Sequence, residues 1–159
     1  MGSASLTRNV DARGLTLASP TQQFEGTCHC QAIAFVYRTA LAPENWQIRA
    51  CQCSFCRSHA ALSTSDPAGA LEFVERGCDA IHRYQFGQRT ADFLLCRSCG
   101  VYVGTAMQLG DKRFGVINVR TLRLSAALPE PVVMTYEGET VAERQTRREK
   151  RWTPIVGGV

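Results

Sequence analysis

The sequence predicts a mainly β fold built largely from antiparallel strands. Between residues 24 and 124, short runs rich in β-branched and aromatic side chains alternate with glycines at the intervals typical of strands joined by turns. No segment in this range keeps an amphipathic helical period for three turns, which excludes a fold of alternating helices and strands. A length of 159 residues also fits one domain better than two.

The first expected element is a flexible leader, residues 1–23, whose small and polar side chains show no lasting period. A single domain is expected to cover residues 24–159. A short helical turn is predicted after Cys56. The predicted strands, in chain order, are residues 33–37, 71–75, 81–86, 93–95, 101–106 and 114–119.

The last predicted element is a helix at about residues 140–152, which follows the turn-like pair Glu137-Gly138 and stops before Pro154. It lies in a basic C-terminal segment, residues 140–159. Because the net charge is only +4, we interpret this helix as a solvated surface element, and nucleic acid is not an expected partner. A patch for an acidic partner is the alternative. The basic residues are Arg144, Arg147, Arg148, Lys150 and Arg151.

The eight cysteines are far above common usage and require an explanation. No apolar stretch approaches the roughly 20 residues of a membrane span, and residues 1–23 lack the apolar block of a signal peptide. The sequence therefore predicts a cytoplasmic protein with no membrane partner. In that reducing compartment, clustered cysteines indicate metal ligands or catalytic thiols rather than disulfides.

Seven of the cysteines form three clusters. In an extended strand, residues i and i+2 share a face, so the thiols of a C-x-C pair can bind one ion. A C-x-x-C pair followed by a glycine makes a tight knuckle, because glycine permits the backbone conformation that brings both thiolates together. The clusters are Cys28 with Cys30, Cys51 with Cys53 and Cys56, and Cys96 with Cys99, while Cys78 stands alone.

Two such pairs make a closed tetrahedral zinc site. Joining the first and third clusters would tie distant parts of the chain together, so the binding energy of zinc would become folding energy. The middle cluster would then supply three thiolates and leave a fourth position for water or a substrate thiol, as catalytic zinc sites do. Spacing alone leaves other divisions open, including Cys51 and Cys53 with Cys96 and Cys99.

Four motifs extend the pattern beyond the cysteines. They are Gly26-Thr-Cys28-His-Cys30, Cys51-Gln-Cys53-Ser-Phe-Cys56-Arg57, Cys96-Arg-Ser-Cys99-Gly100 and Val116-Ile-Asn118-Val-Arg120-Thr-Leu122. In order, spacing and flanking residues they resemble the glutathione-dependent formaldehyde-activating enzyme family, also called the centromere-protein-V-like or carbon–sulfur lyase family. The resemblance spans about residues 24–124.

The resemblance implies an Mss4-like fold of antiparallel sheets with zinc-ribbon-like knuckles. It implies a structural Zn²⁺ on Cys28, Cys30, Cys96 and Cys99, and a catalytic Zn²⁺ on Cys51, Cys53 and Cys56. It also implies a zinc-dependent carbon–sulfur lyase-type enzyme, with a thiol such as glutathione and an aldehyde as its small-molecule partners. The characterised activity of the family condenses formaldehyde with glutathione to S-hydroxymethylglutathione.

The chain departs from the family pattern at two places. Gln31 stands where the family commonly has glycine after the C-x-C pair, which predicts a less tight turn. After Cys56 the segment Arg57-Ser-His59 replaces a basic and glycine-alanine pattern, which changes the expected pocket. We interpret Arg57 as either a ligand for a substrate carboxylate or simple charge compensation. We interpret His59 as a supporting or surface residue rather than a metal ligand.

Two other functions remain open from the sequence. A non-catalytic zinc-binding interaction module would use both metals structurally, since fold alone does not decide function. A thiol redox or metal-storage protein would cycle the middle cluster between thiolate and disulfide. An open metal position beside a pocket would favour the enzyme.

Overall fold

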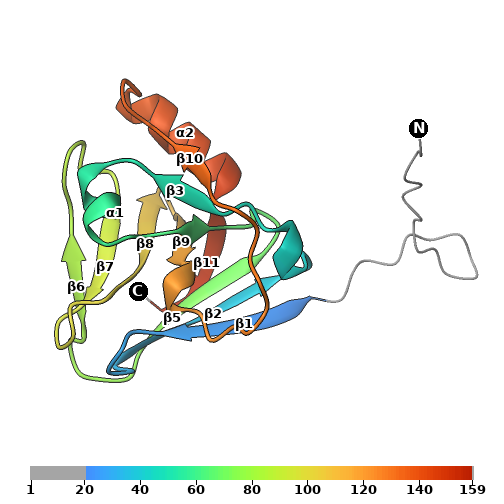
Figure 1. The fold of residues 1–159 in the computed structure, drawn as a ribbon. Coiled ribbons are helices and arrows are strands. Elements are labelled where there is room, and N and C mark those ends of the chain that lie inside the picture. The colour runs from blue at the N-terminus through green and yellow to red at the C-terminus, as the bar shows by residue number, and fades with distance from the viewer. Residues whose placement is uncertain (1–20, 159) are drawn as a thin grey trace, which may run out of the picture.

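The protein is mainly β, as the sequence predicts, in a computed structural model that describes residues 21–158 (Figure 1). The expected leader covers residues 1–23, of which residues 1–20 lie outside the described residues. The first strand begins at Gln22, so the expected domain start at Phe24 falls inside a strand. The strands are β1 (Gln22–Thr27), β2 (Ile33–Thr39), β3 (Arg49–Cys51), β4 (Ser63–Thr64), β5 (Ala70–Glu75), β6 (Ile81–Tyr84), β7 (Asp92–Cys96), β8 (Tyr102–Leu109), β9 (Lys112–Asn118), β10 (Val132–Met134) and β11 (Thr153–Gly157).

All of these strands belong to one connected sheet network that branches at β9. One edge of β9 pairs with β8, and β8 continues through β7 to β6, all antiparallel. The other edge of β9 pairs with β11 near Phe114 and with β4 near Asn118. The strand β11 then leads to β5, β2 and β1, and β4 leads to β3 and β10. Only the β5–β11 and β3–β10 pairs are parallel.

The main core lies where these branches meet. It holds large, fully buried side chains from β2 and β5, among them Phe35, Tyr37 and Phe73. The strand β1 closes over this core at Gly26, which pairs with Phe35 across the β1–β2 hairpin. A Cβ atom at Gly26 would lie 2.1 Å from the Phe35 ring, so only glycine allows this approach.

Two α-helices accompany the strands, α1 (Ser54–Ser58) and α2 (Val141–Arg151), with 3-10 turns η1 (Pro43–Asn45) and η2 (Val119–Thr121). The helix α1 starts before Cys56 rather than after it, because Cys53 is its N-cap and the Cys53 sulfur accepts the Cys56 N–H. The helix α2 confirms the prediction for residues 140–152. Thr140 and Glu143 form a reciprocal capping box at its start.

The basic C-terminal segment is part of the fold. The strand β11 follows α2 directly and lies between β5 and β9, and Figure 1 shows α2 over the end of the molecule that carries β3 and β10. The buried side chain of α2 is Arg148, so this helix packs through a charged residue rather than an apolar stripe. None of the helices within residues 21–158 is long and apolar enough to cross a membrane.

Candidate functional site

The chain brings two groups of cysteine sulfurs together. The first group contains Cys28, Cys30, Cys96 and Cys99, and the second contains Cys51, Cys53 and Cys56; within each group the sulfurs lie within 4.8 Å of one another. These are the two groups proposed from the sequence. Among residues 21–158 no histidine or carboxylate joins either group, and all the cysteines are free thiols. Cys78 is exposed and lies outside both groups.

Two similar knuckles build the four-cysteine group. The N–H of Cys28 donates to the Ile33 carbonyl, and the N–H of Cys96 donates to the Val101 carbonyl, each at 3.0 Å. Each bond joins the first cysteine of a pair to the residue five positions later, so the chain reverses direction around the pair. One knuckle joins β1 to β2 and the other joins β7 to β8, so the group connects two hairpins of different branches of the sheet.

The four-cysteine group fits a tetrahedral zinc ion. With Zn–S bonds of about 2.3 Å, the sulfurs of a tetrahedral site lie about 3.8 Å apart. The Cys28 and Cys30 sulfurs are 3.7 Å apart, and those of Cys30 and Cys96 are 3.5 Å apart. Cys28 and Cys96 are buried in the main core, whereas Cys30 is exposed. The donor set is therefore complete and anchored in the core.

The turn after Cys30 corrects one expectation from the sequence. Gln31 was expected to loosen this turn, but it adopts a left-handed φ of 65° and its N–H donates to the Cys28 carbonyl at 3.1 Å. The turn thus keeps the tight geometry that favours glycine, and a residue with a side chain bears the strain. At the equivalent knuckle Gly100 takes φ 73° without such strain.

Replacing Gln31 with glycine is expected to stabilise the fold by about 1 kcal/mol. The left-handed conformation costs an L-residue about 1–2 kcal/mol, and the greater freedom of glycine in the unfolded chain offsets only part of that gain. The exposed hydrogen bond from Arg123 to the Gln31 side chain contributes little against this gain. Chemical denaturation of zinc-loaded Gln31→Gly and wild-type protein measures the difference. A less stable variant would contradict this account of the turn.

The three-cysteine group is built by β3 and α1. Cys51 ends β3, which pairs with β4 and β10, and the next residue donates its N–H to the Met134 carbonyl at 2.9 Å. Cys53 caps α1 and Cys56 lies one turn later, so all three thiols come from one short bend. The bend is supported by Phe55, whose ring packs on aromatic rings of β6, β7 and β8: Tyr84, Phe93 and Tyr102.

The three thiols are not chemically equivalent. The pKa of Cys53 is lowered because the Cys51 and Cys56 thiols donate hydrogen bonds to its sulfur. The pKa of Cys56 is raised by its hydrogen bonds with Cys51 and then Cys53. Of the three thiols, Cys53 therefore ionises most readily. A divalent cation would stabilise all three as thiolates, so the group fits zinc with one ligand position left over.

This group lies in the wall of a cavity of about 170 Å³. Aromatic and aliphatic side chains of β7, β8, β9 and the C-cap of α2 line part of it, including Phe93, Tyr102, Val116 and Trp152. The lining also contains basic side chains of β3 and α2. Its guanidinium groups belong to Arg49, Arg144, Arg147 and Arg148.

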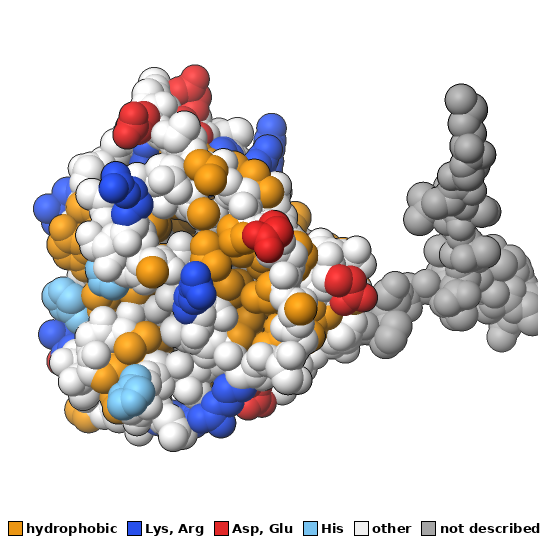
Figure 2. Space-filling model, in the orientation of Figure 1, with side chains coloured by type: hydrophobic (Ala, Val, Ile, Leu, Met, Phe, Trp, Pro, Cys, Tyr) orange, Lys and Arg blue, Asp and Glu red, His pale blue; other side chains and the backbone are white. Residues whose placement is uncertain are grey.

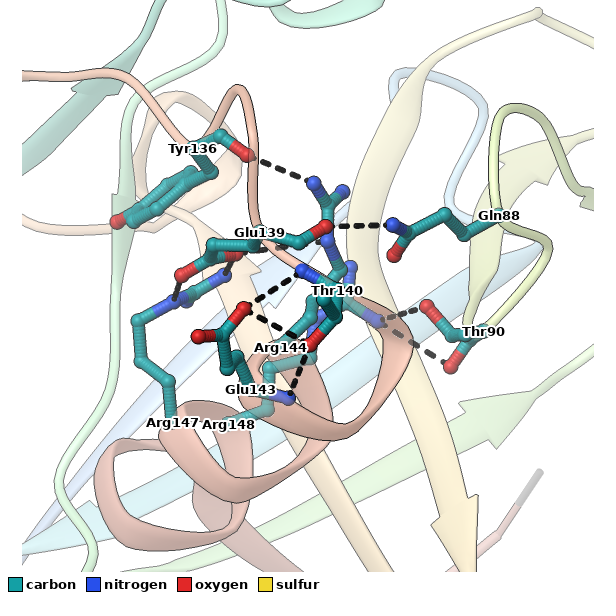
Figure 3. Close-up of polar contacts among 9 residues, drawn as sticks. All are labelled: Gln88, Thr90, Tyr136, Glu139, Thr140, Glu143, Arg144, Arg147 and Arg148. Atoms are coloured by element: carbon teal, nitrogen blue, oxygen red, sulfur yellow. Dashed lines mark hydrogen bonds and ion pairs between the residues drawn. The ribbon is translucent and has the colours of Figure 1, made fainter.

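These arginines were not recognised from the sequence as parts of a site. The helix α2 was interpreted as a solvated element, but three of its arginines line the cavity and one of them is buried. Figure 3 shows Arg147 directed to Glu139, Arg148 to Thr90 and Arg144 to the Tyr136 carbonyl. On the face shown in Figure 2, Lys and Arg side chains are scattered singly around a hydrophobic band. The visible surface therefore offers no continuous basic patch.

The other residues singled out from the sequence lie outside the cavity lining or support it. Arg57 is exposed and does not line the cavity. His59 stacks on the Phe55 ring, with centroids 4.2 Å apart, and its Nδ1 lies 2.9 Å from the Phe55 carbonyl. Asn118 is buried, and its side chain donates to the Tyr102 carbonyl at 2.9 Å, which links β9 to β8. This hydrogen bond gives a structural explanation for the asparagine in the motif of residues 116–122.

Comparison with known proteins agrees with the cysteine pattern. A family model described as glutathione-dependent formaldehyde-activating enzyme matches residues 23–138, which include all seven clustered cysteines and end before α2. The crystal structure of a Rhodobacter sphaeroides protein matches with 30% identity and a TM-score of 0.53, over 69% of this chain and 99% of that one. No curated protein gave a significant match. Since the family model covers well over half of the sequence, the chain belongs to the glutathione-dependent formaldehyde-activating enzyme family.

Proposed function

We propose that this chain is a zinc-dependent enzyme of the carbon–sulfur lyase type that forms or breaks thiol/aldehyde adducts, similar to S-(hydroxymethyl)glutathione synthase. Its substrates would be a thiol such as glutathione and an aldehyde such as formaldehyde. One observation carries the proposal: the three-cysteine group, one ligand short of a tetrahedral set among the described residues, lies in the wall of a cavity. Membership of the family supports the same chemistry.

The division of labour follows from the two donor sets. Cys28, Cys30, Cys96 and Cys99 would hold a structural Zn²⁺ with every position filled. Cys51, Cys53 and Cys56 would hold a second Zn²⁺ and act as the catalytic group. We further propose an Mss4-like arrangement, a single domain over residues 24–159 and a cytoplasmic location, where reducing conditions keep thiolates available for metal.

Bound on the three cysteines, zinc would supply a Lewis acid that lowers the pKa of a substrate thiol, and its thiolate ligands favour soft sulfur donors over water. The protein's own residues prepare the space next to it. Phe93, Trp152 and Val116 give the cavity an apolar lining, and a bound substrate that displaced water from it would strengthen polar interactions inside. The Tyr102 hydroxyl, whose residue also lines the cavity, shares a hydrogen bond with the Thr105 hydroxyl at 2.6 Å.

The proposed activity is tested directly with glutathione and formaldehyde. Zinc-loaded protein is expected to accelerate the interconversion of these substrates with S-hydroxymethylglutathione by at least about 100-fold over the solution reaction, a typical gain for assisted thiol ionisation. Magnetisation-exchange NMR measures the rate at equilibrium, and free zinc at the same concentration is the control. A rate equal to that of free zinc would contradict the proposal and favour the non-catalytic zinc module.

A further inference from the structure

We propose that the cavity beside the three-cysteine group is a carboxylate-binding subsite, in which the guanidinium groups of Arg49 and Arg148 hold an acid group of the substrate. The inference rests on the proposed function and adds the substrate class. The substrate would be a thiol, or a thiol adduct, that carries a carboxylate a short distance from its sulfur. The sulfur would lie at the three-cysteine group and the carboxylate at the arginines, because both sets of residues line one cavity.

The first observation is that two positive charges are buried without an ionic partner. Arg49 is 5% exposed and Arg148 is 7% exposed. Arg49 donates to the Ser65 hydroxyl at 2.7 Å, and Arg148 donates to the carbonyl and hydroxyl of Thr90 at 3.2 and 2.8 Å. Within residues 21–158 neither arginine forms an ion pair with a carboxylate. Burying such a charge is costly unless a counter-charge is supplied.

The second observation concerns the donor atoms that remain. The Nε atom of Arg148 is buried and has no hydrogen-bond partner among the described residues. The guanidinium lies over the Trp152 ring, 4.7 Å from its centroid, which fixes the plane of the group. An oriented guanidinium with a free N–H edge matches the two oxygens of a carboxylate.

Two carboxylates lie close to these arginines. Glu137 lines the cavity, but it is exposed and forms no ion pair with Arg49 or Arg148 within residues 21–158. Glu139 accepts hydrogen bonds from Arg147 at 2.5 and 2.8 Å and lies 3.4 Å from Arg144 (Figure 3). Glu139 is therefore in direct contact with Arg147 and Arg144, whereas Arg148 and Arg49 have no carboxylate in contact within residues 21–158. Glu139 holds Arg144 and Arg147 in position in the wall of the cavity.

The volume of the cavity limits the size of the ligand. At about 170 Å³ it is smaller than the roughly 300–1,000 Å³ of pockets that enclose drug-sized molecules. It fits a small mercapto acid, or one acid-bearing arm of a larger thiol whose remainder stays outside. Arg144 and Arg147 are paired with Glu139, but Arg49 and Arg148 remain, and together they exceed the single negative charge that a zinc-bound group of three thiolates would carry. Charge compensation of the cysteines alone does not account for them.

Three probes separate the two ends of the subsite. 2-Mercaptoethanol offers a thiol, propionate offers a carboxylate, and 3-mercaptopropionate offers both. On the zinc-loaded full chain at pH 7.5 and low salt, calorimetry is expected to show 3-mercaptopropionate binding at least about 10-fold more tightly than 2-mercaptoethanol. Equal binding of the two thiols would overturn the subsite. If propionate binds but neither thiol gains from its sulfur, the carboxylate subsite stands and the proposed function fails.

Variants test whether Arg49 and Arg148 cause the preference for 3-mercaptopropionate over 2-mercaptoethanol. Arg49→Met and Arg148→Met are each expected to reduce the preference to about twofold or less while the zinc content stays at the wild-type value. Arg151→Met is the matched control, since Arg151 is an exposed arginine of the same helix outside the cavity lining. If the methionine variants do not fold, Arg148→Lys keeps the charge but not the guanidinium fork, and a loss of at least about threefold is expected. An unchanged preference, or zinc lost with the arginine, would overturn the proposal.

Discussion

Replacing Cys53 with alanine is expected to lower turnover by at least about 100-fold and to leave the chain folded, because Cys53 would be one of only three protein ligands of the second Zn²⁺. Its segment is one short helical bend on β3, and the three sulfurs are only half-buried. Turnover, circular dichroism and thermal unfolding measure the two effects together.

The matching variant in the other group is Cys30→Ala. Cys30 is exposed, so its replacement removes no core packing, and any loss of stability comes from the four-cysteine site. We expect this variant to unfold or to lose several kcal/mol, since the group joins hairpins far apart in the sequence. Cys78→Ala, an exposed cysteine outside both groups, should match the wild type in both measurements. Equal unfolding of the Cys53 and Cys30 variants would contradict the division between a structural and a reactive site.

Zinc removal is expected to proceed in two steps with very different consequences. A chelator should first take the metal from the three-cysteine group, which borders a cavity, with loss of activity and little change in circular dichroism. The second metal should leave only as the chain unfolds, because binding by structural cysteine sites contributes about 10–16 kcal/mol in small zinc domains. Cys28 and Cys96 lie within the main core, so their site opens only when the core opens.

A titration with a chromogenic chelator, followed in parallel by absorbance and circular dichroism, resolves these steps. Adding zinc back after the first step should restore activity without refolding. Release of both metals in a single transition that coincides with unfolding would contradict the two roles. Full activity after loss of the first metal would also contradict the assignment of one structural and one catalytic zinc.

The sequence predicted the three cysteine clusters and most of the longer strands, and the resemblance to the family was needed to combine the clusters into two groups. The strand β1 was not among the predicted strands. Metal-ligand spacing is a local property, and the knuckle at Cys96, Cys99 and Gly100 forms as its spacing suggests. The strands β3, β4 and β10 were not predicted because two or three residues carry no readable alternation. The strand β11 was not predicted because Pro154 lies within it, although the apolar run after Trp152 could have indicated a strand.

The cavity could not be predicted, since it depends on tertiary contacts. A charged helix is normally solvated, and α2 shows no apolar stripe that would indicate a buried face. The burial of Arg148 results from β11, which follows the helix directly, and from the contacts of Arg148 with Thr90 and Trp152. The family match ends before α2, so the arginine face is outside the part of the chain that the resemblance describes.

Anomalous diffraction at the zinc edge from crystals of the full chain tests the central claim most directly. We expect two zinc peaks per chain, one surrounded by the sulfurs of Cys28, Cys30, Cys96 and Cys99. The other should have the sulfurs of Cys51, Cys53 and Cys56 and a fourth ligand that is not a protein atom. A single zinc peak, a fourth protein ligand on the second ion, or disulfides among these sulfurs would contradict the account.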